Sequence, residues 1–511
     1  MMSLSGTILD EPLLTFGHGQ SLAHPKDGLF LYGPMEPKTA QELRIGAIGS
    51  RAALECLERW MQSVRGFIPA FSEKPHHAPF PGVEAAFGVK WAPKPQQTIV
   101  LPDGALETRI RYSDKHRRVY DAVDLVVTEL LNYKRRSDVR PDVWMVVLPE
   151  VVSRYGRPKS KVPKEQQVQA PSAATSTFYR RNADAPFLFP EDEAARLPYQ
   201  YELNFHNQLK ARLLEDEIVT QVVRDTTLTP LDFVDSSGRP TRGVQDAATT
   251  AWNLLTTLYY KVAGPPWRLT NVRPDVCYIG LVYKEDASRP RSQRVCCGAQ
   301  MFLGTGEGVV FRGHLGPWDS VRNGEHHLDA DTAEVIIREV VESYREEHLR
   351  APAEIFIHGR TRFTRDEWSG FQKGASGVPI VSAIQIQQSK DVKLFRDKTD
   401  EVEASLNVAR GTALIIDART AYLWTTGYVP RLHTYPGWEV PNPYRISVQR
   451  GDADIRLVLA DVLGLTKLNF NACIFADGQP VTLRFADAVG EILTAGHEFK
   501  KLKPLPFKFY I

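Results

Sequence analysis

The chain has 511 residues, of which 43% are apolar and 10% aromatic. This composition excludes a disordered chain, and the length suffices for two or more domains. The 63 basic and 61 acidic residues give a net charge of +2. A balance so close to zero excludes a globally basic nucleic-acid coat, although it leaves room for a local basic groove.

Cysteine spacing and the N-terminal sequence predict the compartment. The five cysteines contain no CxxC pair, so we expect neither a disulfide framework nor a structural zinc site, and a reducing cytoplasm is favoured. The opening MMSLSGTILDEPLL lacks the basic and apolar regions of a signal peptide. No stretch approaches the 18 consecutive apolar residues of a membrane-spanning helix. The sequence therefore predicts a cytoplasmic protein without a membrane partner.

Helical and strand-like patterns alternate along the first half of the chain. Residues 120–133 have apolar side chains at helical spacing, and the β-rich run 142–148 predicts a buried strand. A helix followed by a buried strand is typical of a parallel α/β layer. Residues 154–175 are rich in Pro, Lys and Ser, which predicts a mobile loop that is either solvated or touches phosphates. Helical patterns resume at 201–224 and 245–261.

The pattern changes after the GPPW sequence at 264–267. Gly-rich turns join three strand-like runs, which predicts an antiparallel meander over 277–284, 294–304 and 308–316. An amphipathic helix is predicted at 329–348 and a short buried strand at 353–359. Three strands, a helix and another strand form the order of a ribonuclease-H-like core. We place a domain boundary near 265–275.

Several polar residues on the predicted helices could bind a phosphate. His206 and Lys210 are four residues apart and share a helix face. Gln221 follows in a run with a helical pattern, and Lys261 ends the helix that carries Asn253. Basic groups, polar donors and an aromatic ring can together hold one phosphate with a stacked base. Each residue alone also fits a simpler role, such as a helix-dipole partner or a surface histidine.

The order of these residues resembles a known family. HxxxK, then Gln, then Asn and Lys before GPPW resembles the guide 5′-phosphate pocket of the Argonaute MID domain. Later motifs resemble the PIWI domain in order: CYIGLVY, APAEIFIHG, NVARGTALII, VPNPYRISV and PVTLRFADAVGEIL. The opening FGHGQSLAHPKDGLFLYGP looks like that of short prokaryotic Argonautes, and nothing before His206 looks like a PAZ domain.

The resemblance implies an α/β fold in two parts. Residues 1–100 would form an N-terminal segment that leads into a Rossmann-like MID domain at 101–270, which binds the guide 5′ end. A ribonuclease-H-like PIWI domain would follow at 271–511.

The resemblance also implies that the PIWI domain is inactive. Its nuclease reaction needs carboxylates that hold two divalent metals. Val282, two residues after Gly280, occupies the first carboxylate position, and His358 occupies the second. Valine cannot bind a metal, and one histidine cannot hold a Mg²⁺ pair, because hard cations need oxygen ligands. A shifted alignment in which Asp286 or Asp366 serves stays open.

Two further groups of residues have roles implied by the family. The polar residues Gln388, Lys390 and Lys393 lie where PIWI touches the nucleic-acid backbone, although a plain polar strand edge is equally open. The ending KPLPFKFYI predicts a buried tail. In the family the terminal carboxylate, here that of Ile511, helps to hold Mg²⁺ at the guide 5′ phosphate, together with Gln221. Hydrophobic docking of the tail alone stays open.

The implied function is that of a guide-binding subunit. The chain would bind a 5′-phosphorylated guide RNA, pair it with target DNA and activate a partner effector subunit against plasmids and phage. That partner would carry a PAZ-like (APAZ) domain fused to a sirtuin-type, TIR or nuclease domain, and enzymatic activity is expected there rather than in this chain. One alternative is a self-sufficient guided nuclease, which carboxylates at positions 282 and 358 would favour. A Rossmann-type enzyme would need a GxGxxG after its first strand, which is absent.

Overall fold

The computed structural model describes most of the chain. The described residues are 5–36, 42–170, 178–179, 189–271, 273–285, 294–303, 308–311, 315–317, 325–395, 407–435, 437, 439–496 and 505–511. Asp286 and part of the predicted loop 154–175 lie outside them. No helix in these ranges is long and apolar enough to cross a membrane.

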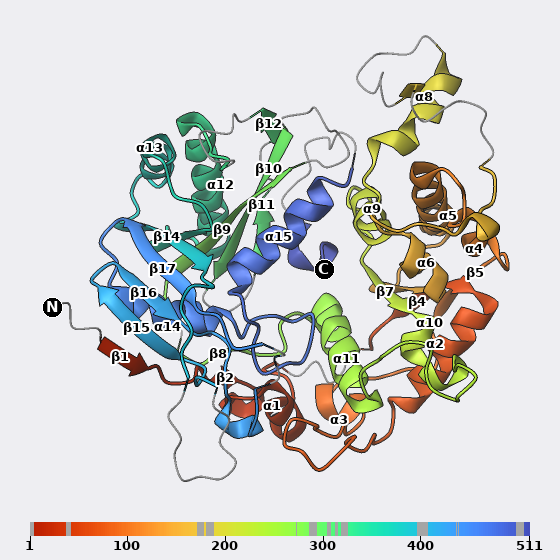
Figure 1. The fold of residues 1–511 in the computed structure, drawn as a ribbon, viewed down its shortest axis with the longest axis horizontal. Helices are drawn as coiled ribbons and strands as arrows, with labels where there is room; N and C mark the ends of the chain where they lie inside the picture. The colour runs from red at the N-terminus through yellow and green to blue at the C-terminus, as the bar shows by residue number, and fades with distance from the viewer. Residues whose placement is uncertain are drawn as a thin grey trace.

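A four-stranded parallel sheet lies on the right in Figure 1. Its strand order is β5 (Gln97–Leu101), β4 (Ile45–Ser50), β6 (Val143–Leu148) and β7 (Thr220–Arg224). One face packs against α2 (Arg51–Ser63) and α11 (Ala247–Ala263). The other packs against α5 (Lys115–Arg136) and α9 (Phe205–Leu213). Helices on both faces of a parallel sheet confirm the predicted α/β layer.

One predicted element of this layer is wrong. The run that contains Gln221 was expected to be helical, whereas residues 220–224 form the edge strand β7, parallel to β6. The β-branched residues Thr220, Val222 and Val223 explain the difference, because such side chains favour the strand over the helix.

The second sheet, called the large sheet below, has eleven strands in the described part of the chain, and the four-stranded sheet is called the small sheet. The predicted ribonuclease-H-like order of strands forms the centre of the large sheet. The strands β9 (Val276–Glu285), β10 (Arg294–Leu303) and β11 (Gly308–Phe311) form the expected antiparallel meander. β13 (Glu354–Gly359) and β14 (Ile380–Gln388) then run parallel to β9.

Helices cover both faces of this centre. α12 (Ala330–His348) and α13 (Arg365–Gly374) pack on one face. α14 (Ile455–Leu465) and α15 (Val481–Leu493) pack on the other face. The hydrophobic core on that face continues into the small sheet. Asp329 caps α12 by accepting a hydrogen bond from the Thr332 amide, which fixes the start of this helix close to the predicted position.

Further strands extend the second sheet at both edges. β17 (Tyr444–Arg450), β16 (Thr420–Leu423) and β15 (Thr412–Asp417) follow β14, and β18 (Leu505–Pro506) pairs with β11. β1 (Ser5–Ile8) completes the edge beside β15. Residues 1–100 therefore supply strands to both sheets, since β4 and β5 belong to the small one. The boundaries at residues 100 and 270 stay predictions.

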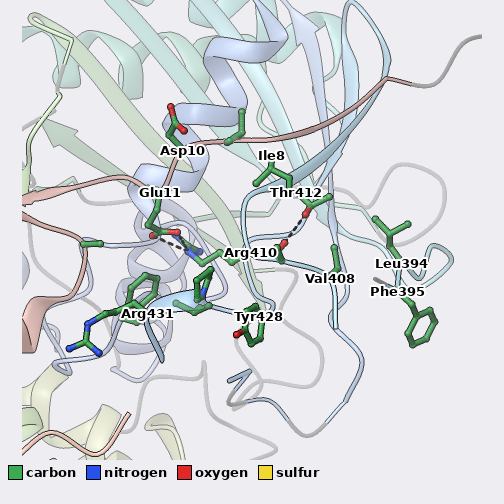
Figure 2. A pocket seen from close by; sticks show the side chains of 16 residues that line it. Ile8, Asp10, Glu11, Leu394, Phe395, Val408, Arg410, Thr412, Tyr428 and Arg431 are labelled. Carbon is green, nitrogen blue, oxygen red and sulfur yellow. Dashed lines mark hydrogen bonds and ion pairs between the residues drawn. The ribbon is translucent and has the colours of Figure 1, made fainter. Parts of the chain in front are cut away.

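An ion pair between a partly exposed carboxylate and two buried cations joins the N-terminal segment to the large sheet. The Glu11 carboxylate accepts hydrogen bonds from Arg410 Nε at 2.9 Å and from Lys467 Nζ at 2.8 Å. The Arg410 and Lys467 side chains are only 3% and 0% exposed. Figure 2 shows Glu11 turned toward Arg410 beside a cavity of about 770 Å³, while the neighbouring Asp10 points away. A carboxylate thus offsets the charge of two cations that are almost completely buried.

Candidate functional site

Two lysine ammonium groups meet at one backbone carbonyl of the small sheet. Lys210, on α9, donates from Nζ to the Thr220 carbonyl oxygen at 3.0 Å. Lys261, near the end of α11, donates to the same oxygen at 2.8 Å and to Gln221 Oε1 at 2.6 Å. The structure therefore brings together three of the predicted residues, Lys210, Gln221 and Lys261. They come from helices on opposite faces of the sheet, and β7 joins them.

These two lysines lack a counter-charge among the described residues. They are 2% and 1% exposed, and the acceptors that the described residues offer them are neutral oxygens of Thr220 and Gln221. Burial lowers the pKa of Lys210 to about 7. Burial, and then the charge of Lys210, lower the pKa of Lys261 well below its usual range. Because buried cations without a partner are costly, a bound anion would stabilise this cluster.

His206 lies one helical turn before Lys210, in the first turn of α9. Asn204 caps this helix and accepts a hydrogen bond from the His206 amide at 3.1 Å. The imidazole is exposed, yet partial removal from water and the charge of Lys210 lower its pKa to about 4. The ring is therefore neutral at pH 7 and presents an aromatic surface on which a base can stack.

A cavity of about 330 Å³ opens beside His206. Its wall includes the apolar side chains of Leu148, Val222 and Leu254, and Arg157 and Arg224 also line it. This volume falls within the range of small-molecule pockets in proteins, roughly 300–1,000 Å³. The cavity can therefore take a ring system of nucleotide size next to the imidazole. Neither Lys210 nor Lys261 is among the residues that line this cavity.

The two arginines at this cavity were not singled out in the sequence. Arg157 lies within the stretch 154–175, for which a phosphate-touching loop was one of two interpretations. Arg224 ends β7 and pairs with Glu150 at 3.3 Å. The excess of basic residues around 154–164 was the signal that could have found Arg157, whereas nothing in the sequence marked Arg224.

Asn253 is not brought to the lysine cluster. It lies eight residues before Lys261 on α11, which is about 12 Å along the helix axis. Its Nδ2 donates to Gln245 Oε1 at 2.9 Å, and its Oδ1 accepts from the Cys473 amide at 2.9 Å. The side chain thus joins α11 to the chain segment that precedes α15.

The C-terminal tail is buried, as the sequence predicted. Phe507 stacks on Phe485 with ring centroids 3.4 Å apart, and Ile511 is 6% exposed. The turn Phe507–Phe509 contacts α11, the helix of Lys261. Figure 1 accordingly has the C-terminus close to α11. The burial of the tail is thus confirmed, and the metal-binding role of the Ile511 carboxylate stays a prediction.

Val282 and His358, which the family resemblance predicts to replace nuclease carboxylates, lie on neighbouring strands. Val282, on β9, is buried in the apolar core, and His358, on β13, is paired in register with Gly280. His358 Nδ1 lies 3.0 Å from the Thr482 hydroxyl, and burial lowers its pKa to about 3, so the ring is neutral. Asp366 is exposed in the first turn of α13. Within the described ranges, no three His, Cys, Asp or Glu residues are grouped to hold a metal.

The residues assigned to backbone contact lie at an exposed strand end. Gln388 is the last residue of β14, and Lys390 follows it in solvent. Lys393 is also exposed, and its Nζ donates to the Val440 carbonyl at 3.1 Å and to Asn442 Oδ1. Both interpretations, backbone contact and plain polar edge, therefore stay open.

Comparison with known proteins identifies the fold. No family model matches the chain, and no curated protein matches its sequence. Among solved structures, Clostridium butyricum Argonaute bound to a guide DNA and a 19-mer target DNA matches 98% of this chain and 55% of its own, at 15% identity and a TM-score of 0.62.

Two structures of A. aeolicus Argonaute also match. One covers 98% of this chain and 54% of its own at 13% identity, and the other, with externally bound siRNA, covers 99% and 56% at 12% identity. Both have a TM-score of 0.52. The chain thus spans about half the length of these structures, and its fold is Argonaute-like.

Proposed function

We propose that this chain is a guide-binding subunit that holds the 5′ phosphate of a nucleic-acid strand at Lys210 and Lys261. One observation carries the proposal: both ammonium groups are buried at the Thr220 carbonyl, and the described residues give them no carboxylate. A phosphate would supply that missing negative charge. The terminal base would stack on the neutral His206 ring beside the 330 Å³ cavity.

The held strand would serve as a guide for a target. Base pairing then supplies the sequence specificity, while the protein reads backbone and helix shape. The Clostridium butyricum Argonaute is bound to both a guide DNA and a target DNA in its structure, which supports the nucleic-acid class of both ligands. For this chain we propose an RNA guide and a DNA target, as the resemblance to short prokaryotic Argonautes implies.

We further propose that Mg²⁺ joins the 5′ phosphate, held by Gln221 and by the Ile511 carboxylate. The donor set fits in kind, because amide and carboxylate oxygens are hard ligands. Gln221 Oε1 accepts from Lys261 at 2.6 Å, so this oxygen would exchange the ammonium group for the metal. When bound, the cation would offset repulsion between the carboxylate and the phosphate.

We propose that the part of the chain that contains the large sheet binds the target nucleic acid but does not cleave it. By the family resemblance, Val282 and His358 would occupy the positions at which a nuclease of this fold needs oxygen ligands. The burial of Val282 and the neutral ring of His358 support this proposal. We therefore propose that target binding acts through a partner effector subunit with an APAZ domain fused to a sirtuin-type, TIR or nuclease domain. Such a pair would act in defence against plasmids and phage. A self-sufficient guided nuclease is the alternative.

Filter binding with 5′-phosphorylated and 5′-hydroxyl RNA tests the phosphate site. A hydrogen bond to a charged group contributes about 1.5–3 kcal/mol, so Lys210→Ala or Lys261→Ala should weaken binding of phosphorylated RNA roughly ten- to a hundredfold. Lys373→Ala, on the exposed side of α13, is the matched control and should bind as the parent does. Equal affinity of the parent protein for the two RNA ends would contradict the proposal.

A cleavage assay separates the two functions. Guide-loaded protein incubated with a labelled complementary target and Mg²⁺ or Mn²⁺ should leave the target intact. A single cut at a fixed distance from the guide 5′ end would favour the self-sufficient nuclease.

A co-expression experiment tests the proposed partner. This chain, co-expressed with the product of an adjacent gene, should form a stable heterodimer. If size-exclusion chromatography shows no heterodimer, the result would count against an effector partner.

A further inference from the structure

The cavity of about 770 Å³ beside Glu11 lies outside the site described above. It forms where the N-terminal segment meets the large sheet, and Ile8 of β1 and its partner Thr412 of β15 both line it. Further walls come from the chain segments 394–395, 408–410 and 428–431. A volume of this size falls within the range of small-molecule pockets in proteins, roughly 300–1,000 Å³. The cavity is therefore large enough for a ligand of its own.

Backbone hydrogen bonds hold the walls of this cavity in place. The Leu9 amide donates to the Gly411 carbonyl at 2.9 Å, next to the β1–β15 ladder. Gly411 has a φ of +86°, and a Cβ at this position would lie 2.9 Å from the Leu9 carbonyl oxygen, so a glycine is needed for this close approach. The Tyr428 amide donates to the Val408 carbonyl at 2.8 Å, and the Arg410 amide donates to the Tyr428 carbonyl at 3.0 Å. The cavity is thus formed in advance of any ligand.

The cavity has a buried apolar floor and an exposed apolar rim. On its floor, Val408, Val429 and Phe475 are only 3%, 7% and 8% exposed. At its rim, Ile8 and Phe395 are 67% and 59% exposed. Figure 2 shows both rim side chains among those that line the cavity. Water therefore contacts a concave apolar surface, and a ligand that covered this surface would gain from the hydrophobic effect.

The charged side chains at this cavity already have partners. The Glu11 carboxylate accepts hydrogen bonds from Arg410 and Lys467. Arg431 donates from Nε and Nη2 to the two carboxylate oxygens of Asp27, at 2.9 and 3.1 Å. Each cation that lines the cavity is therefore paired with a carboxylate of the protein itself.

The remaining polar groups add no charge for a ligand. Arg410 also donates from Nη1 to the Thr425 carbonyl and from Nη2 to the Thr466 hydroxyl at 2.8 Å. Asp10 points away from the arginine, as Figure 2 shows. An ionised ligand would lose its hydration here without gaining an opposite charge, which is costly. The chemistry of the cavity therefore favours an uncharged ligand.

Aromatic rings from three separate segments line the cavity. Phe395 is exposed at the rim, Tyr428 is half-buried and Phe475 is buried at the floor. Aromatic rings prefer offset or edge-to-face contacts with centroids about 4.5–7 Å apart. A ligand with a planar ring can make such contacts from the rim to the floor.

We propose that this cavity binds an uncharged, largely apolar small molecule that carries an aromatic ring. A protein partner usually needs a broader face, of about 800 Å² on each side, whereas a concave cavity with a buried floor suits a small molecule. The inference does not depend on the proposed guide-binding function, because none of the residues assigned to that function lines this cavity. A bound molecule would contact both β1 and β15 and so stabilise the attachment of the N-terminal segment.

The test uses two fluorescent probes that differ in one charged group. N-phenylnaphthylamine is uncharged and apolar, and anilinonaphthalene sulfonate has the same rings with an added anionic group. The uncharged probe should bind the full chain saturably and raise its melting temperature, because a ligand of the folded state stabilises that state. The sulfonate should bind this cavity about tenfold more weakly or less, because its charge has no partner there.

Two variants locate the probe. Phe395→Ala removes an exposed ring from the rim and should weaken binding of the uncharged probe about tenfold. Thr412→Trp places an indole at the cavity wall in a strand that tolerates aromatic residues, and it should abolish binding. The matched control is Phe67→Ala, which removes a phenylalanine of similar exposure, 63%, outside the cavity. If Thr412→Trp does not fold, Phe395→Ala and its control carry the test.

The outcomes separate the possible occupants. Absence of saturable binding to the parent protein, or equal binding to the parent and Phe395→Ala, would overturn the inference. Equally tight binding of the sulfonate at this cavity would overturn the uncharged class of ligand. Loss of a co-purified protein from both cavity variants, without probe binding to the parent, would assign the cavity to that protein and also overturn the inference. Binding of 5′-phosphorylated RNA should be the same in Phe395→Ala and the parent, so a failure here leaves the proposed function intact.

Discussion

Two pairs of buried basic side chains in this molecule differ in the acceptor that the members of each pair share. Arg410 and Lys467 share the Glu11 carboxylate, whereas Lys210 and Lys261 share a neutral carbonyl. Burial lowers the pKa of Lys467 to about 8, and Glu11 opposes this effect, while the pKa of Lys210 falls to about 7 with no opposing carboxylate. The first pair has the composition of a structural contact. The second lacks a described carboxylate, as expected for the anion-binding site that we propose.

The largest expected effect tests the structural pair. Glu11→Gln would leave Arg410 and Lys467 buried without a counter-charge, and loss of one partner from a buried ion pair costs about 3–5 kcal/mol. Denaturant unfolding should therefore give a free energy of unfolding lower by about 3 kcal/mol. Asp10→Asn is the matched control, because this neighbouring carboxylate is exposed and points away from the arginine. An equal loss in both variants would show that Glu11 has no special role.

A smaller effect is expected in the pH dependence of phosphate binding at Lys210 and Lys261. Because the pKa of Lys210 is about 7 in the folded protein and near 10.5 when unfolded, the folded state binds fewer protons between these values. The contribution of Lys210 to the free energy of unfolding therefore rises with pH between about 7 and 10.5. Anion binding needs the protonated amine, so the affinity for a 5′ phosphate should fall above pH 7, by up to about tenfold per pH unit.

The measurement is the ratio of binding constants for phosphorylated and hydroxyl-ended RNA from about pH 6.5 to about pH 9. The second ionisation of a phosphate is near pH 6, so the ligand charge hardly changes in this range. Lys210→Met should remove most of the pH dependence. A ratio that stays constant in the parent protein would mean that neither lysine titrates against the ligand.

The smallest expected effect is a change in the free energy of unfolding. Its sign is opposite to that of most substitutions at buried positions. Lys261→Met removes a cation that has no carboxylate among the described residues, and apolar replacement of buried charges is often neutral or stabilising. Without nucleic acid, unfolding should therefore show a change between zero and a gain of about 1 kcal/mol. A loss of more than about 2 kcal/mol would place Lys261 with the structural cations, beside Lys467.

The sequence predicted most of the large sheet and little of how its parts join. The meander, the helix of residues 330–348 and the strand of residues 354–359 have strong local patterns, and all three are present. Gln221 was placed in a helix because its short apolar run fits either period, and pairing with β6 decided the outcome. β1 and β4 were not predicted at all, since their partners lie far along the chain.

The functional residues were likewise predicted only in part from the sequence. Lys210 and Lys261 were predicted from a motif, and they meet because the two helices pack on opposite faces of one edge strand. The apolar cavity beside β1 was missed, because short segments far apart in sequence form it. Its aromatic residues Phe395, Tyr428 and Phe475 lie in separate segments, and no local pattern indicates that these segments meet.

The contact between Glu11 and the large sheet also constrains the order of events during synthesis. Glu11 and Arg410 are separated by 399 positions, which a ribosome translates in roughly 20–80 s at about 5–20 residues per second. During that interval β1 lacks its partner strand β15. The N-terminal segment must therefore stay extended, or be sheltered by a chaperone, until the sheet edge emerges. β1 is thus translated long before the strand with which it pairs in the fold.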